Sequence, residues 1–96
     1  MLTIVLSAFG CEKNDAIVCS SSTSNDLGVC KGTYNLCRGV TFVIACSPAG
    51  GGKTGVDCQC IEGGATKKTY RGEDECNVTP DVLKKRAAAG CGWELD

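Results

Sequence analysis

Residues 40–46 read VTFVIAC, and this segment carries the clearest strand signal in the 96-residue chain. β-Branched and aromatic side chains dominate it, and such residues are enriched in strands because they pack well on a pleated surface. We therefore expect residues 40–46 to form a central strand of a sheet.

After this segment, the sequence predicts a loop, a second strand, and a turn into a third strand. Residues 47–52 read SPAGGG and indicate a flexible loop. Residues 56–61 then return as a strand with Val56, Cys58 and Cys60 on one face. Gly63 and Gly64 turn the chain, and residues 66–70 complete a hairpin with that strand.

The N-terminal half predicts two strands, a loop and a helix. Residues 2–9 and 16–19 are strand-like, and residues 20–25, SSSTSN, indicate a polar loop ending in good helix N-cap residues. From Asp26 the apolar spacing changes to that of a helix, which Gly39 would end. The helical stripe consists of Leu27, Cys30, Tyr34 and Cys37.

The C-terminal segment predicts a second helix from Pro80 to Ala89. Thr79 is a suitable N-cap, proline is favoured at the first helical position, and Gly90 is a suitable stop. Residues 92–96 alternate as a short edge strand would. The chain is thus expected to be one α+β domain, residues 1–96, with an antiparallel sheet of four or five strands, two helices packed on it, and disulfides that stabilise it.

Nine cysteines are spread along the chain, as a disulfide scaffold requires, and this indicates a secreted, extracellular protein. The chain contains no Cys-x-x-Cys pair, so we expect no metal site. Neighbouring same-face residues of a strand lie about 6.6 Å apart, at the limit of disulfide reach, so Cys58 and Cys60 are expected to bond to different partners. Since nine is odd, one cysteine stays unpaired, either buried as a free thiol or bridging two chains in a disulfide-linked dimer. The disulfide candidates are Cys11, Cys19, Cys30, Cys37, Cys46, Cys58, Cys60, Cys76 and Cys91, of which Cys76 and Cys91 bracket the second helix and are placed to tie its ends to the sheet.

Composition excludes several classes of function. Ten basic and eleven acidic residues give a net charge of -1, so we expect no nucleic-acid partner. The chain has no histidine, the commonest general base, and we expect neither an enzyme nor a bound cofactor. No stretch approaches the roughly 20 apolar residues of a membrane span. Residues 1–10 lack a basic region and a cleavage site, so we interpret them as the start of a mature domain with an added initiator methionine.

Three motifs have structural explanations. Residues 47–54, SPAGGGKT, resemble a phosphate-binding loop, but Ser47 replaces its first glycine and no helix can follow, so a hairpin loop is favoured. Residues 77–79 form an N-glycosylation sequon with Asn77 as the candidate, although the capping role of Thr79 accounts for the motif. The basic residues between 67 and 86 are interpreted as a solvated charged face, offset by acidic residues 73–75.

The surface that contacts a partner is predicted to consist of cationic and aromatic residues. Lys53 lies in the glycine-rich loop, and Tyr70, Arg71 and Trp93 are expected to form an aromatic and cationic surface near it. For Trp93 a role as a core residue of an edge strand is favoured over that of a contact anchor for a sugar or a partner.

The chain resembles fungal secreted cysteine-rich proteins, which include small effectors and killer toxins. The resemblance is carried by the size, the dispersed cysteines, Cys58-Gln59-Cys60 on a strand, and the helix closed by residues 89–92. It is similar to killer-toxin-like α/β sandwich effectors, in which helices pack on one face of an antiparallel sheet. The resemblance assigns no functional residue.

The leading expectation is a secreted, non-enzymatic effector, of the kind that contributes to virulence, which binds a host protein or glycan. One alternative is a killer-toxin-like antimicrobial that acts on a membrane or channel. A second is an inhibitor of extracellular hydrolases, with its exposed loop at residues 47–55 or 20–25, and a third is a thiol-active protein that uses the unpaired cysteine.

Overall fold

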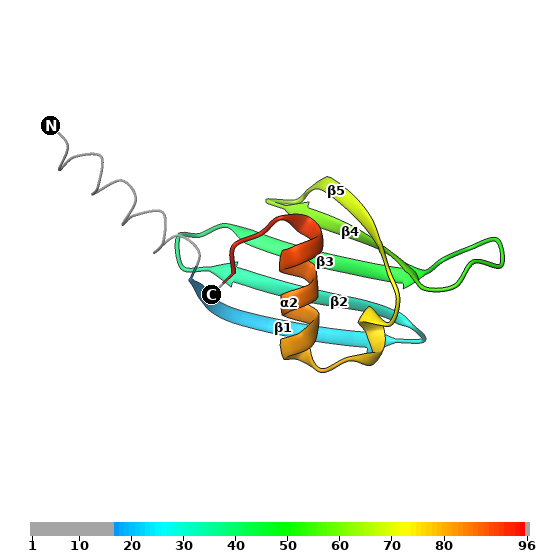
Figure 1. Cartoon of the computed structure of the whole chain (residues 1–96). Coiled ribbons are helices and arrows are strands. Elements are labelled where there is room, and N and C mark those ends of the chain that lie inside the picture. Colours follow the sequence, from blue (N-terminus) through cyan, green and yellow to red (C-terminus); the bar gives the residue numbers. More distant parts are fainter. Residues whose placement is uncertain (1–16, 96) are drawn as a thin grey trace, which may run out of the picture.

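The computed structural model describes residues 17–95, which form a single antiparallel sheet with one α-helix on it (Figure 1). The strands follow one another in the order β1-β2-β3-β4-β5, so that each is paired with its neighbour in the sequence. A short 3-10 helix and the α-helix complete the chain. The elements are β1 (Val18–Asp26), β2 (Val29–Leu36), β3 (Thr41–Pro48), β4 (Val56–Glu62), β5 (Ala65–Gly72), η1 (Glu75–Asn77) and α2 (Pro80–Cys91).

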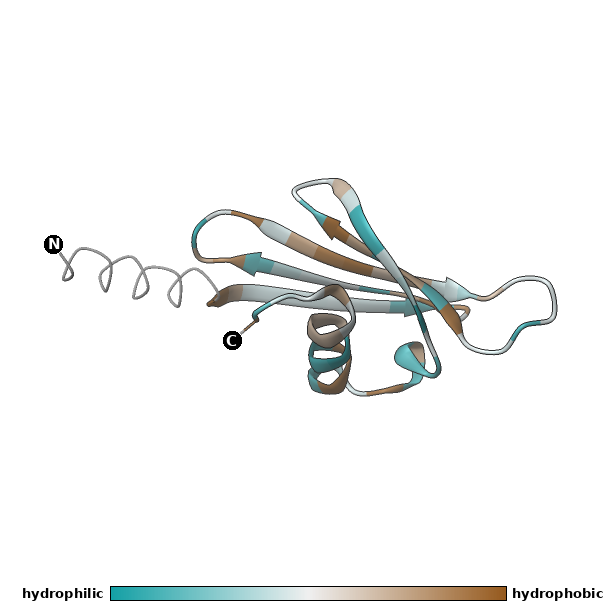
Figure 2. Cartoon of the chain, turned by 45° about the horizontal axis from the view of Figure 1, so that its top comes forward, coloured by the Kyte–Doolittle hydropathy of each residue, from teal (hydrophilic) through white to brown (hydrophobic). Residues whose placement is uncertain are grey.

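One face of the sheet, called the covered face, holds the core. Side chains alternate between buried and more exposed along β2, β3 and β4, because successive residues of a strand point to opposite faces. Both views place η1 and α2 on the same side of the sheet (Figures 1 and 2). The buried apolar residues are Cys30, Tyr34, Leu36, Phe42, Ile44, Cys46, Val56, Cys58, Cys60, Cys76, Leu83, Ala87, Cys91 and Trp93.

Helix α2 begins and ends with defined caps. The Thr79 hydroxyl accepts a hydrogen bond from the Val82 N–H at 3.4 Å, and Pro80 occupies the first helical position. The helix passes through Gly90, the predicted stop, and ends at Gly92, which has a φ of 73°. Gly90 has a packing role instead, since a Cβ there would lie 2.7 Å from the ring of Tyr70.

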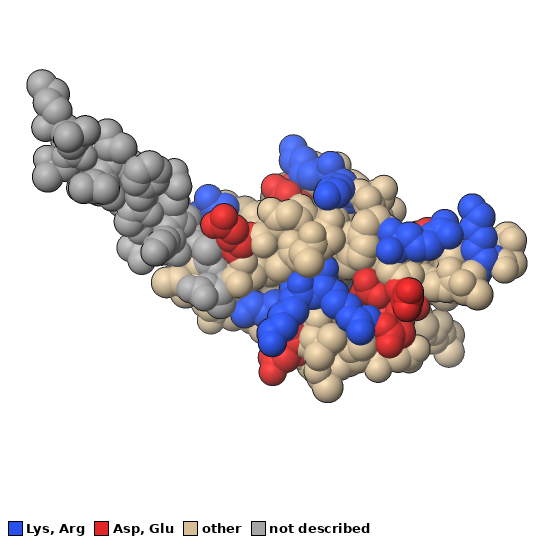
Figure 3. Space-filling model, in the orientation of Figure 1, with Lys and Arg blue, Asp and Glu red and all other residues tan. Residues whose placement is uncertain are grey.

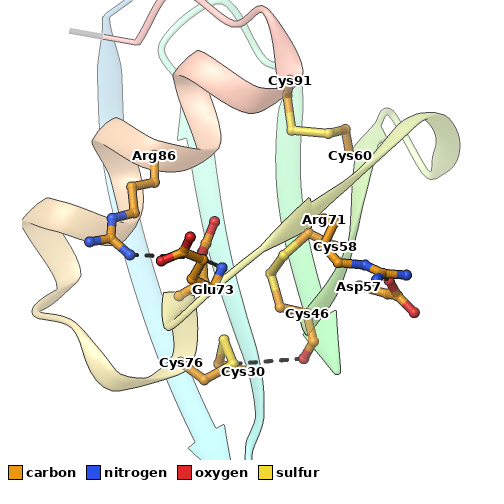
Figure 4. The surroundings of a disulfide bond; sticks show 11 residues. Cys30, Cys46, Asp57, Cys58, Cys60, Arg71, Glu73, Cys76, Arg86 and Cys91 are labelled. Atoms are coloured by element: carbon orange, nitrogen blue, oxygen red, sulfur yellow. Dashed lines mark hydrogen bonds and ion pairs between the residues drawn. A yellow bond between two sulfur atoms is a disulfide. The ribbon is translucent and has the colours of Figure 1, made fainter. Parts of the chain in front are cut away.

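Four disulfides join the eight cysteines of the described residues. Cys58 and Cys60 bond to different partners, as predicted, and Cys76 and Cys91 tie the segment of η1 and α2 to the sheet at both ends (Figure 4). Each bridge shrinks the unfolded ensemble, typically stabilising a domain by about 2–4 kcal/mol. The remaining cysteine, Cys11, lies outside the described residues. The bonds are Cys19–Cys37, Cys30–Cys76, Cys46–Cys58 and Cys60–Cys91.

The helix predicted from Asp26 is wrong, because that segment forms the turn between β1 and β2 and then β2 itself. Leu27 and Gly28 have φ values of 53° and 81°, which places both in left-handed conformations that reverse the chain. The same residues can form either a helix with one apolar stripe or a strand with alternating burial. The strand is formed because pairing in the sheet buries Tyr34 and Leu36 in the core.

The polar loop predicted at residues 20–25 is also wrong, since these residues belong to β1. They pair with residues 30–35 of β2 through the backbone, which needs no apolar side chains. In Figure 2, β1 is pale along most of its length, whereas brown residues recur in the neighbouring strands. β1 is therefore a strand that the hydrophobic pattern does not mark.

The predicted α+β class holds, with five strands but one α-helix in the described residues instead of two. The central position of β3, the return strand β4 and the hairpin to β5 are confirmed. The predicted C-terminal edge strand is wrong: residues 93–95 are outside the sheet, and the Trp93 N–H donates to the Ala88 carbonyl. The predicted strand at residues 2–9 lies outside the described residues.

Candidate functional site

The second face of the sheet, called the open face, is covered by no helix of the described residues. It presents side chains from all five strands, and its centre is formed by the half-buried residues Val43, Ala45 and Ile61. The surrounding residues are polar and carry mainly hydroxyl and amide groups. They are Ser20, Ser22, Ser24, Lys31, Thr33, Asn35, Thr41, Ser47, Asp57, Gln59, Thr66, Thr69 and Arg71.

Hydrogen bonds order part of this face across three strands. The Thr41 hydroxyl donates to Asn35 Oδ1 at 2.9 Å, and Asn35 Nδ2 donates to the Ser20 hydroxyl at 3.0 Å. On the other side, Arg71 Nε lies 3.1 Å from Asp57 Oδ1 (Figure 4). The open face therefore presents donors and acceptors that are held in place by neighbouring strands, a property suited to binding a partner.

Lys53 and Arg71 come together, as predicted. Both line an open hollow where the loop between β3 and β4 meets β5, together with Thr54, Gly55, Gly72 and Glu73. Basic and acidic atoms adjoin one another beside this loop (Figure 3). Since Arg71 is already paired with Asp57, Lys53 is the cation of this hollow for which the structure gives no acidic partner.

Trp93 does not belong to this surface, so the prediction of Trp93 as a contact residue is wrong. Its side chain is 7% exposed and stacks on Phe42, with ring centroids 4.9 Å apart. The indole N–H donates to Glu62 Oε2 at 3.0 Å. Trp93 is a core residue whose polar edge is satisfied by a carboxylate that the sequence analysis did not single out.

Tyr70 is half-buried, and its ring packs against Gly90 of α2. Its hydroxyl is buried without a hydrogen-bond partner. Burial, and then the negative charge of Glu75, raise the pKa of Tyr70 to about 12. Tyr70 therefore links the sheet to the helix instead of forming a contact surface.

A buried polar cluster, which the sequence analysis missed, lies between the sheet and α2. Glu75 is 5% exposed, accepts a hydrogen bond from the Glu73 N–H at 2.9 Å, and lies 3.7 Å from Arg86. The Tyr34 hydroxyl is buried without a partner, and burial raises the pKa of Tyr34. Gly72 makes this arrangement possible, because any Cβ at that position would overlap the Glu75 carboxylate.

The basic residues of α2 are partly neutralised, as predicted for a charged face offset by acidic neighbours. Arg86 pairs with both Asp74 and Glu75. The hydrogen bond from Arg86 lowers the pKa of Asp74. Over the helix side of the molecule, a group of basic atoms is bordered by acidic atoms (Figure 3).

Asn77, the glycosylation candidate, is exposed at the end of η1. Its N–H donates to the Asp74 carbonyl at 2.8 Å, and Thr79 caps α2. An exposed position permits modification, and glycosylation of Asn77 stays a prediction.

Within residues 17–95 no cluster of three or more Asp, Glu, His or Cys side chains is arranged to hold a metal ion. None of the helices in this part of the chain has the length and apolar character needed to cross a membrane. Comparisons of the chain with protein-family models, curated proteins and solved structures find no match.

Proposed function

We propose that the protein is a secreted, non-enzymatic binding protein of the effector kind, and that the open face of its sheet contacts a host protein. The observation that carries this proposal is the asymmetry of the sheet. Its covered face is filled by α2 and three of the four disulfides, whereas its open face leaves ordered polar side chains of five strands exposed. Four disulfides are compatible with an oxidising, extracellular environment.

A protein partner is favoured over a glycan by the positions of the aromatic residues within residues 17–95. Sugars are commonly held by stacking on an exposed aromatic ring. Phe42 and Trp93 stack on each other in the core, and Tyr34 and Tyr70 also face the helix side. The open face instead combines a small apolar centre with a polar rim, the usual anatomy of a protein–protein contact.

The proposal is tested by placing the same substitution on the two sides of the molecule. Ala45 lies at the centre of the open face, and Ala89 is exposed on α2. The oxidised protein, Ala45→Lys and Ala89→Lys are passed over panels of immobilised extracellular proteins and glycans. We expect Ala45→Lys to weaken binding to the protein partner by at least about tenfold, or 1.4 kcal/mol, and Ala89→Lys to leave it unchanged.

Thermal unfolding of both variants separates loss of binding from loss of fold. Equal binding by Ala45→Lys and the unsubstituted protein would contradict the role of the open face. Binding to glycans alone would contradict the choice of a protein partner.

A second candidate, an inhibitor of extracellular hydrolases, is favoured by the loop between β3 and β4, which projects well beyond the sheet (Figure 1). Lys53 is exposed in this loop, and the Cys46–Cys58 bridge joins the two strands close to its base. The other loop considered, residues 20–25, is excluded because it is part of β1. If this candidate is correct, the protein inhibits a hydrolase that selects basic residues, and Lys53→Ala abolishes inhibition while Ala45→Lys does not.

A further inference from the structure

We propose that β1 is a self-association edge, through which two copies of the chain join their sheets into one ten-stranded antiparallel sheet. This inference does not depend on the identity of the partner of the open face. It rests on the difference between the two edges of the sheet, on the exposed apolar residues around β1, and on the register that brings those residues together.

The β5 edge is protected against strand addition. Lys67 is an extra residue in its pairing with β4, since Cys60 lies opposite Lys68 and Ile61 lies opposite Thr66. Bulges and lysines on an edge strand are the usual means of preventing edge-to-edge pairing. Antiparallel pairing of two β5 strands would also bring their basic residues, Lys67, Lys68 and Arg71, close to one another in most registers.

The β1 edge has less of this protection, since its one bulge, at Cys19, lies at the start of the strand and leaves the rest of the edge regular. Residues 18–25 contain no charged residue, no proline and no glycine, and Asp26 at the end is the first charge of the strand. Residues 19–26 are all exposed, and the pairing with β2 is regular from Ser20 to Asp26. The outer backbone groups of β1 therefore offer a regular template on which another strand can form hydrogen bonds.

Exposed apolar side chains gather around this edge. The described residues include four exposed large hydrophobics, and all of them lie near β1 in the chain or in space. Ile17 directly precedes β1, Leu27 and Val29 follow it, and Val82 is in the first turn of α2. That turn lies near β1, because Pro80 and Leu83 line a small hollow with Thr23, Ser24 and Asn25.

Leu27 is the most unusual of these residues. It is 93% exposed and has a φ of 53°, a left-handed conformation that glycine or asparagine adopts far more readily than leucine. Neither the turn nor the core of a single chain explains a leucine here. An apolar contact made by a second copy does explain it.

The self-pairing register follows from these positions. In an antiparallel pair centred on Ser22, Ser20 lies opposite Ser24. Beyond the bulge at Cys19, the ends of the two strands bring Ile17 of each copy near Leu27 of the other. Ser21 faces Thr23, Asn25 lies beside Cys19, and Asp26 lies near Val18, so no like charges meet. One register thus covers two exposed apolar residues per chain and opposes no charges.

The helices leave room for this arrangement. A two-fold axis perpendicular to the sheet keeps both α2 helices on one side and both open faces on the other. The two Ser24 residues, each near the first turn of an α2 helix, would be about 14 Å apart along the strands, which exceeds the helix diameter of about 10 Å. Because the β5 edges are protected, association ends at a closed dimer and does not continue into a fibre.

The test is sedimentation of the oxidised full-length chain carrying Cys11→Ser, so that no intermolecular bridge through Cys11 can contribute. We expect a species of about twice 9.9 kDa at micromolar concentration. Ser22→Lys, which places two ammonium groups opposite each other at the two-fold axis, is expected to weaken association at least about tenfold. Thr69→Lys on β5 is the matched control and is expected to leave the dimer intact.

Leu27→Gly separates association from folding. Glycine adopts the left-handed conformation without strain, so the melting temperature at a concentration where the chain is monomeric should stay equal or rise, while the dimer weakens about tenfold. A monomer at all concentrations up to about 100 μM, where even a weak dimer would populate, would overturn the proposal. Equal effects of Ser22→Lys and Thr69→Lys would overturn it as well.

Discussion

β1 and β3 pair with the same strand, β2, one on each side of it, and both pairings are antiparallel. β3 buries Phe42, Ile44 and Cys46 in the core, whereas the side chains of β1 are exposed from Cys19 to Asp26. The two strands have the same backbone pairing and opposite degrees of burial. Their difference shows that a backbone ladder can extend a sheet beyond the region that its hydrophobic core stabilises.

This difference has a thermodynamic consequence. Ordering a residue costs about 1–2 kcal/mol of backbone entropy, and burial of apolar surface offsets that cost in β3 but not in β1. β1 is held by its hydrogen bonds to β2, by the Cys19–Cys37 bridge, and by the hydrogen bond from the Asn25 side chain to the Cys76 carbonyl. β1 is therefore expected to open more often than β3.

The largest difference is expected from truncating one side chain in each strand. Ile44 is fully buried in β3, and Ile44→Ala should lower the free energy of unfolding by about 2–5 kcal/mol. Ser22→Ala in β1 should change the free energy of unfolding by less than about 0.5 kcal/mol. Denaturant unfolding at a concentration where the chain is monomeric measures both, and a comparable cost for Ser22→Ala would show that β1 is part of the cooperative core.

The second largest difference between β1 and β3 is expected when the disulfides are reduced. Cys19 and Cys37 are exposed, whereas the cysteines of the other three bridges are buried. Because exchange requires access of a thiolate to a sulfur atom, a mild thiol should reduce Cys19–Cys37 first, at least about tenfold faster than the others. Alkylation followed by mass spectrometry identifies the reduced pair.

Hydrogen exchange completes that experiment. After selective reduction of Cys19–Cys37, amides of β1 should lose protection while those of β3 keep it. Simultaneous loss in both strands, or earlier reduction of a buried bridge, would contradict the separation between edge and core.

A smaller change should make β1 more like β3. Thr23 lies on the covered side, opposite Gly32, and lines a hollow of about 110 Å³ with Leu83. Thr23→Ile fills part of this space with apolar groups and should stabilise the protein by up to about 1 kcal/mol. Calorimetry compares it with Ser22→Ile on the open side, which has no such hollow to fill and should give no gain.

The smallest effect is confined to alkaline solution. The pKa of Tyr34 is raised by burial, and that of Tyr70 is raised to about 12 from an ordinary value of 10.0. Since the unfolded chain ionises its tyrosines near pH 10, stability is fully present below that pH and falls as the pH rises through 10 toward 12. At pH 10, ultraviolet absorbance should show tyrosines that are about half ionised in denaturant and less ionised in the folded protein.

The pKa of Tyr34 is also a probe of the difference between β1 and β3, because Tyr34 lies between Ser21 of β1 and Phe42 of β3. Opening of β1 after reduction of Cys19–Cys37 should lower the pKa of Tyr34 toward its ordinary value. An unchanged titration would show that β1 does not shield Tyr34.

The sequence predicts the parts of this fold that are specified by burial. β3, β4 and α2 carry apolar or capping signals that agree with their environment, and residues 66–70 were recognised as the partner of β4. β1 is polar on both faces, so hydrophobic patterning cannot distinguish it from a loop. In β2 the alternating apolar pattern is interrupted by Gly32. A larger residue does not fit there, because its Cβ would lie 2.6 Å from the Tyr34 hydroxyl oxygen.

The candidate site was predicted only in part for a related reason. The proximity of Lys53 and Arg71 was predicted because a loop and a nearby strand residue are readily placed together, and their role in binding stays a prediction. Trp93 was misplaced because the residue that receives its indole N–H, Glu62, is 31 positions away. The open face was not predicted, because its serines on β1 were interpreted as a loop and the neighbouring β2 was interpreted as a helix.

The disulfide connectivity has a consequence for resistance to proteolysis. The loops closed by Cys19–Cys37, Cys30–Cys76 and Cys60–Cys91 overlap in sequence, so together they span every peptide bond from residue 19 to residue 91. A single cut of the backbone anywhere in this interval therefore leaves one covalently connected molecule. Damage by a protease in that interval has to occur at least twice before any piece can be released.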